Sequence, residues 1–248
     1  MYGRIVFGAA AVLFGVIALL WHDAETWQNV RYIWKLPFGA IIGACLMSLQ
    51  IAGGIGIQFA PSTRWGSLVL GVVYSSFALA CLAGVVAAPH IYAQYGSFFE
   101  QFSLLCGAMG VYAASETNAA RAVMVGRVAR VGLGVCAISF TLSQIVYFRF
   151  TAELVPKWIP PNPMFWAVLT TIAFALAAVA ILLNRKARLA MRLLTVMLAL
   201  FGVLVWIPRL IAHPEAHLNW SEFALTLLIT GAVWVVGEWS GRAGRVSV

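Results

Sequence analysis

Residues 65–88 read WGSLVLGVVYSSFALACLAGVVAA, a run of 24 residues without a charged side chain. An α-helix rises about 1.5 Å per residue, so this run makes a helix of about 36 Å, enough to cross the roughly 30 Å hydrocarbon core of a bilayer. Arg64 precedes the run and Pro89 follows it. A cation and a proline are typical ends of such a helix. The stretch is therefore predicted to span a membrane.

The composition of the whole chain agrees with this stretch. Of its 248 residues, 62% are hydrophobic and 10% are charged, and the mean hydropathy is +0.93. Soluble domains are about 45–50% apolar, and a soluble chain of this length could not bury so many apolar side chains. These values exclude a water-soluble enzyme, a disordered chain, a secreted disulfide scaffold and a DNA-binding domain. We predict an all-α integral membrane protein.

Other largely uncharged stretches predict seven further membrane-spanning helices, eight in all. The expected spans are 3–21, 36–59, 65–88, 98–115, 124–147, 164–183, 188–212 and 220–239. The first run could instead be a cleaved signal peptide, but its length and the Trp-bearing segment after it favour a retained helix. The linkers are short, so no folded aqueous domain is expected.

Basic residues are distributed unevenly between the two sides of this expected arrangement. Eleven Lys and Arg residues fall on the side that holds both termini, and five fall on the other side. Because basic residues are enriched on the cytoplasmic side, both termini are predicted to be cytoplasmic, in the inner (cell) membrane. The net charge of +8 is explained by this enrichment of basic residues on the cytoplasmic side and by their attraction to anionic lipid headgroups. Membrane lipids are therefore the expected partners, and nucleic acid is not.

The spacing of four acidic residues indicates an internal repeat. Glu100 and Glu116 bracket fifteen uncharged residues, and so do Glu222 and Glu238, at an offset of 122 residues. Glycine, arginine and proline matches follow in the same order at offsets of 123 to 125 residues. Matches that recur in order at nearly one offset predict a duplicated chain.

The duplication predicts the domain organisation. Residues 1–118 form a first four-helix membrane repeat and residues 119–248 a second one. Four helices per repeat is an even number, so both repeats enter from the same side of the membrane. We therefore expect two tandem four-helix bundles related by a pseudo-two-fold axis along the membrane normal, with a shared cleft between them.

One stretch of the second repeat, residues 147–166, reads YFRFTAELVPKWIPPNPMFW. It resembles the DoxX family of small four-helix membrane proteins in its aromatic pair, its Val-Pro-x-Trp-Ile-Pro loop and the aromatic residue that opens the next helix. Thr171 stands where a glycine is common, and the resemblance covers residues 126–239 well but the first repeat only in its helix layout. It implies a quinone-linked or otherwise redox-associated membrane subunit for some relatives, and assembly or escort of partner proteins for others.

Two glutamates are the main candidates for chemistry. Glu100 and Glu222 occupy equivalent places at the outer ends of two short expected spans. Ionisable groups at the edge of a membrane are candidates for proton transfer to a quinone or for holding a polar ligand, and Arg149 and Arg209 are the expected counter-charges. We expect Glu222 to be the more important of the two, since its repeat carries the family motif.

A structural alternative remains for both glutamates. Ser97-x-x-Glu100 and Asn219-x-x-Glu222 have the spacing of capping boxes, in which the carboxylate satisfies a free amide at the start of a helix. The spacing alone leaves both interpretations open.

Other ligand-binding candidates lie near the same outer opening. Gln144 precedes the aromatic pair by one turn and is expected on the wall of an outward-facing pocket, and Trp158, His90 and His213 lie on the same side. No metal site is predicted. His213 and His217 have the i, i+4 spacing of a weak alternative, which Pro214 disfavours because it interrupts a helix.

Three functions remain compatible with the sequence. The first is a membrane subunit of a redox system that binds a quinone-like or other amphipathic ligand near the outer interface and works with a redox partner protein. The second is a transporter or lipid-handling protein, and the third is a non-catalytic assembly or escort factor. No catalytic residue can be named, and whether the protein is an enzyme stays undecided.

The predicted topology can be tested by labelling single cysteines in a variant that lacks the native ones. A probe at position 186 should react with an impermeant reagent only from the cytoplasmic side, and a probe at position 94 only from the outside. Labelling of position 186 from the outside would overturn the prediction.

Overall fold

The computed structural model describes residues 2–21 and 28–246. Its first half contains α1 (Tyr2–Leu20), α2 (Gln28–Trp34), α3 (Gly39–Gly56), the 3₁₀ turn η1 (Ala60–Ser62), α4 (Thr63–Ala87) and α5 (Tyr92–Ser115). The second half contains α6 (Ala119–Val146), α7 (Phe148–Leu154), α8 (Pro163–Leu182), α9 (Ala187–Phe201), the π-helical segment η2 (Gly202–Trp206), α10 (Ile207–Ala212) and α11 (His217–Val246). The described residues are thus all-helical apart from turns.

Seven helical stretches in these described ranges are long and apolar enough to cross a membrane. They are Tyr2–Leu20, Gly39–Gly56, Ala60–Ala87, Ala119–Val146, Pro163–Leu182, Ala187–Ala212 and His217–Gly241. The prediction of an α-helical, multi-pass membrane protein is confirmed by the length and apolar composition of these helices. The expected span 98–115 falls in α5, which is 24 residues long but is not among the seven. Its N-terminal half is polar, with Gln94, Glu100 and Gln101.

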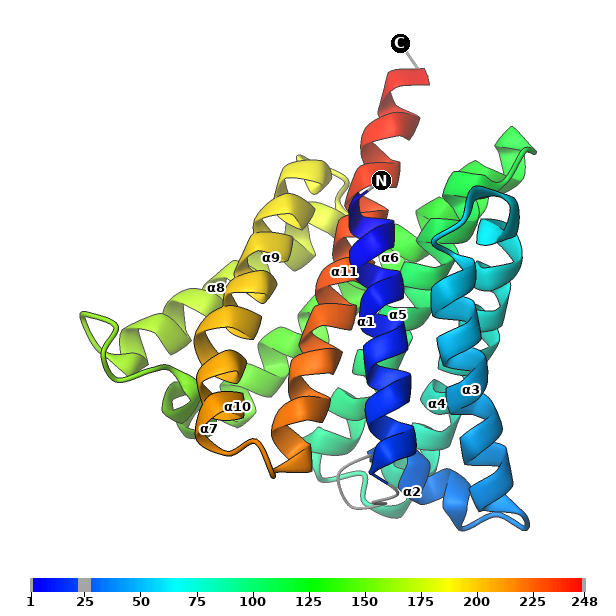
Figure 1. Cartoon of the computed structure of the whole chain (residues 1–248). Coiled ribbons are helices and arrows are strands. Elements are labelled where there is room, and N and C mark those ends of the chain that lie inside the picture. Colours follow the sequence, from blue (N-terminus) through cyan, green and yellow to red (C-terminus); the bar gives the residue numbers. More distant parts are fainter. Residues whose placement is uncertain (1, 22–27, 247–248) are drawn as a thin grey trace.

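The arrangement of the helices differs from two separate bundles. α1 packs against α11, α6 packs against α5, and α5 packs against α11. The first long helix of each half therefore contacts the last helix of the other half. Figure 1 shows α3 and α4 on one side of this central group and α8 and α9 on the other, with the start of α1 and the end of α11 at the same end. The two halves are therefore in direct helix contact through the α1–α11, α5–α6 and α5–α11 pairs.

Glycines make the central contacts close. A Cβ atom at Gly107 of α5 would lie 2.5 Å from the Cβ of Ala232 of α11. A Cβ at Gly231 of α11 would lie 2.6 Å from the Cα of Phe7 in α1. Both distances are shorter than any van der Waals contact, so only glycine allows these backbones to approach so closely, as is common where membrane helices associate.

The turn between α5 and α6 is fixed by one carboxylate. Glu116 accepts hydrogen bonds from the Tyr112 hydroxyl at 2.6 Å and the Asn118 backbone N–H at 3.0 Å. It also forms ion pairs with Arg64 of α4 at 3.2 Å and with Arg121 of α6 at 3.5 Å. The hydrogen bonds from Tyr112 and Asn118, followed by the two guanidinium groups, lower the pKa of Glu116 to about 2. The ends of three helices are joined at this point.

Substitution of Gly231 tests the α1–α11 contact. Gly231→Ala should destabilise the protein by about 1–3 kcal/mol, because the new methyl group meets the Phe7 backbone, which cannot move aside. Gly71→Ala is the matched control, since a Cβ there would lie 4.0 Å from its nearest neighbour, Leu105. It should be neutral or stabilising, as alanine is the better helix former. Thermal unfolding in detergent measures both, and equal effects would contradict the packing described.

The Glu116 cluster predicts a pH-dependent contribution to stability. Its carboxyl has a folded-state pKa of about 2, below its ordinary value of 4.5. A lowered pKa stabilises the folded state above the ordinary value, and that stabilisation is lost as the pH falls from about 4.5 toward 2. Glu116→Gln should therefore lower the melting temperature at pH 7, and the difference from the unmodified protein should shrink over that interval. Glu153→Gln, at an exposed position, is the control. A difference that stays constant with pH would count against the cluster.

Candidate ligand-binding site

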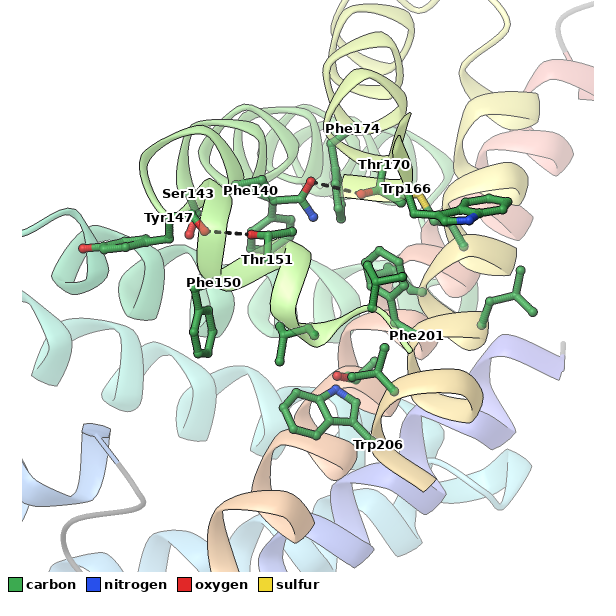
Figure 2. Close-up of a pocket in the computed structure, with 18 of the residues that line it drawn as sticks. Phe140, Ser143, Tyr147, Phe150, Thr151, Trp166, Thr170, Phe174, Phe201 and Trp206 are labelled. Atoms are coloured by element: carbon green, nitrogen blue, oxygen red, sulfur yellow. Dashed lines mark hydrogen bonds between the residues drawn. The ribbon is translucent and has the colours of Figure 1, made fainter. Parts of the chain in front are cut away.

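A cavity of about 560 Å³ lies between α5 of the first half and helices of the second half. Its walls come from α5, α6, α7 and the loop after it, α8, α9, η2 and α11 (Figure 2). The lining residues are Ala93, Gly96, Ser97, Glu100, Phe140, Ser143, Gln144, Tyr147, Phe150, Thr151, Leu154, Val155, Pro156, Ile159, Trp166, Thr170, Phe174, Met197, Leu198, Leu200, Phe201, Leu204, Val205, Trp206, Thr226 and Ile229. The volume falls in the range of about 300–1,000 Å³ that is usual for small-molecule sites.

Aromatic side chains from different helices form much of the wall. Figure 2 shows Phe140 of α6, Phe150 of α7, Phe174 of α8, Phe201 of α9 and Trp206 of η2 around the opening. The rings of Phe140 and Phe174 meet edge to face with centroids 5.8 Å apart, and those of Phe174 and Phe201 are 6.5 Å apart. Rings held in this way present flat apolar faces and polarised edges to a bound molecule.

The stretch 147–166, which carries the family resemblance, forms one wall of the cavity. Eight lining residues come from it: Tyr147, Phe150, Thr151, Leu154, Val155, Pro156, Ile159 and Trp166. Its conformation is held by hydrogen bonds from the Trp166 indole N–H to the Pro160 carbonyl at 2.9 Å and from the Phe165 N–H to the Asn162 side chain at 2.9 Å. The Tyr147 hydroxyl accepts a bond from the Ala93 N–H at 3.0 Å, which ties this wall to the start of α5.

Gln144 lines the cavity from α6. Its Oε1 accepts a hydrogen bond from the Thr171 hydroxyl at 2.9 Å, and the Thr170 hydroxyl lies 3.4 Å away. Thr171, the residue that departs from the family pattern, thus fixes the orientation of the Gln144 side chain. In the described part of the chain no acceptor contacts the amide nitrogen of Gln144, so its N–H groups are available to a ligand.

Glu100 brings a carboxyl group to the same cavity. It lines the cavity from α5, and Glu222 on α11 is close enough to interact with it electrostatically. Glu222 itself is not among the lining residues, so Glu100 is the better placed of the two to contact a ligand. The predicted counter-charges do not pair with them: Arg149 is exposed, and the Arg209 guanidinium lies over the Trp206 ring, 5.4 Å from its centroid.

The capping interpretation of both glutamates is wrong. α5 begins at Tyr92, so Ser97 is inside the helix, where its hydroxyl donates to the Ala93 carbonyl at 3.1 Å. Asn219 lies inside α11, and its side chain donates to the carbonyls of Arg209 and His213, each at 3.3 Å. Glu100 and Glu222 are therefore at least one helical turn beyond the free amides that a capping box would satisfy.

Three other candidates lie away from the cavity. His90 is exposed between α4 and α5, and the Trp158 side chain is 69% exposed in the loop after α7. His213 is exposed and pairs with Glu215 at 3.5 Å. None of the three is among the lining residues, so the structure does not bring them together with Gln144 and Glu100.

The weak metal alternative also fails to assemble. His217 is buried, 5.1 Å from Trp21 between ring centroids, whereas His213 is on the surface. Within residues 2–21 and 28–246 there is no group of three or more His, Cys, Asp or Glu side chains that could hold a metal ion. His22 and Asp23, which the sequence places on the same side as His213, lie outside the described residues.

Sequence reasoning missed the segment η2, which contributes Leu204, Val205 and Trp206 to the cavity. The Ile207 N–H bonds to the Gly202 carbonyl five residues earlier, which is the π-helical pattern. Pro208 explains the local change, because it lacks the N–H that would bond to the Leu204 carbonyl in an α-helix and its ring crowds that carbonyl. A proline inside an apolar run was the available signal.

No protein-family model, no curated protein and no solved structure matches the chain. The resemblance to the DoxX family rests on the quoted residues and stays a prediction.

Proposed function

We propose that the protein binds a quinone-like amphipathic molecule in this cavity and serves as a membrane subunit of a redox system. The observation that carries the proposal is the joint presence of aromatic walls, a free amide donor and a carboxyl group in one cavity among membrane-spanning helices. Sites for small molecules typically combine mostly apolar walls with a few polar groups of this kind.

The recognition chemistry suits a quinone ring. Its carbonyl oxygens accept hydrogen bonds, which the Gln144 amide can donate, and its flat ring fits against the faces or edges of Phe140 and Phe174. An isoprenoid tail needs only apolar surface, which Leu198 and Leu204 supply on the opposite wall. The bound head would then be near the outer interface and the tail among the helices.

Glu100 and Glu222 fit a role in proton transfer. Reduction of a quinone to a quinol takes up two electrons and two protons, and in this proposal a partner protein supplies the electrons. A carboxyl group that lines the cavity and a second one beside it can pass protons to the quinone oxygen. Ionisable residues inside a membrane protein that lack a paired cation are candidates for such transfer.

The membrane arrangement that we propose has eight crossings, with α5 as the eighth. Its 24 residues make a helix of about 36 Å, and its polar side chains are shielded because it packs among α4, α6 and α11. An even number of crossings agrees with the start of α1 and the end of α11 at one end (Figure 1). The basic residues favour the cytoplasm for that end and the cell membrane for the protein, and the 122-residue offset supports two duplicated halves.

Substitution of Glu100 and Gln144 tests the ligand site. Glu100→Gln and Gln144→Leu should each weaken binding of a short-chain quinone such as decylubiquinone by about tenfold or more, the usual loss for a hydrogen bond involving a buried polar group. Glu215→Gln is the matched control, because Glu215 is exposed and far from the lining residues. Binding is measured by the ligand-induced shift in melting temperature, and the melting temperature without ligand reports folding. Variants that bind like the unmodified protein would remove both residues from the site.

Mass spectrometry of the detergent-extracted protein separates the three functional classes. A co-purified quinone supports the redox proposal. A different result would be a phospholipid in the cavity that stays bound in the Glu100→Gln variant. Together with transport of a solute or lipid across reconstituted vesicles, this result favours a transporter or lipid-handling protein. An empty cavity that gives no shift with the quinone favours an assembly or escort factor.

A further inference from the structure

The cations at the end where α1 begins are not all compensated by acidic residues. Glu116 pairs with Arg64 of α4 and with Arg121 at the start of α6. The second half places Arg127, Arg130, Arg185 and Lys186 at the same end, a group named here the cationic cluster. Its members come from α6 and from the turn between α8 and α9.

The structure brings the members of the cationic cluster together. The Arg130 guanidinium of α6 donates to the Ile181 carbonyl at the end of α8, so α6 and the α8–α9 turn are in contact at this level. Arg127 is one turn closer to the start of α6 and interacts electrostatically with Arg130. Arg127, Arg185 and Lys186 are exposed. Three exposed cations thus lie near the contact of α6 with the end of α8.

No acid of the described chain compensates this charge. Of the acidic residues that the structure describes, Glu116 and Glu238 lie at this end of the bundle. Glu116 is occupied by Arg64 and Arg121, and Glu238 accepts a bond from the Tyr2 backbone N–H at 3.2 Å. Neither carboxylate pairs with the cationic cluster, whose charge is therefore open to an external anion.

The surroundings of the cationic cluster identify the chemistry of that counter-ion. α9 begins at Ala187 without a side-chain cap, and the free N–H groups of its first turn add partial positive charge beside Lys186. Exposed apolar side chains lie next to the cationic cluster. Val128 of α6 is 51% exposed, Val131 of α6 is 40% exposed, and Leu183, directly after α8, is 66% exposed. A phosphate next to such a surface is what a phospholipid presents, whereas a free anion would gain nothing from it.

We propose that the cationic cluster binds the phosphate headgroup of an anionic phospholipid, whose acyl chains lie against the exposed apolar surface of α6 and α8. This site is independent of the cavity and of its ligand. The bound lipid would supply to the cationic cluster the negative charge that Glu116 supplies to Arg64 and Arg121.

The proposal is tested by titrating the delipidated protein with phosphatidylglycerol or phosphatidylcholine and counting bound lipids by native mass spectrometry. The unmodified full chain should bind phosphatidylglycerol in preference to phosphatidylcholine. Arg127→Gln combined with Lys186→Gln should weaken that binding roughly 30-fold, because each cation near an anionic lipid contributes about a fivefold factor. Arg31→Gln combined with Lys35→Gln removes the same charge at the opposite end and should leave the binding unchanged.

Arg185→Gln provides a second test. Arg185 lies in an exposed turn, so its substitution should not affect folding, and it should weaken phosphatidylglycerol binding about fivefold. Raising the salt concentration should weaken the preference for phosphatidylglycerol, as for any exposed charge interaction. Inorganic phosphate at the same concentration should not displace the lipid. Equal binding of the two lipids, an equal loss in the Arg31/Lys35 control, or displacement by inorganic phosphate would overturn the proposal.

Discussion

The close contact between α5 and α11 is the constraint on which the rest of the structure depends. α5 carries Glu100 and Gln101 in a helix that lipid alone would not accommodate, because each unpaired polar group in hydrocarbon costs several kcal/mol. Gly107 lets α5 approach Ala232 so closely that α11 covers one side of it, while α4 and α6 cover the others. With α5 enclosed, α1 and α6 complete a central group, and the remaining helices pack outward from it (Figure 1).

The same centre explains why the halves have different interiors. In the first half, large side chains such as Phe7, Leu70, Tyr74 and Phe77 are fully buried and fill the space between the helices. Where the second half meets α5, the Phe140 and Phe174 rings meet edge to face, the Phe201 ring is tilted against Phe174, and all three line a cavity. Pro208 follows the π-helical η2, which lines the same cavity. The interior of the first half is therefore filled by side chains, whereas a cavity remains between α5 and the second half.

Part of this organisation could be read from the sequence. Long apolar runs predicted the membrane-spanning helices, because the length that crosses a bilayer is fixed by helix geometry. Gln144 was placed near the aromatic pair because one helical turn separates them, and it lies among the lining residues of the cavity. The partners of each helix could not be predicted: apolar periodicity identifies a buried face but not what covers it. Spacing alone also misled at Glu100 and Glu222, because a capping box requires a helix start that only the fold can establish.

The two carboxylates of α5 have different surroundings. At the turn between α5 and α6, Glu116 has two guanidinium partners and serves as a structural tie. Glu100 lines the cavity, and among the described residues its charged neighbour is Glu222 and not a cation. A carboxyl group without a paired cation beside an aromatic cavity is a candidate for ligand binding. Both carboxylates belong to α5. Glu116, at the end of the helix, is the structural acid, and Glu100, inside the helix, is the functional candidate.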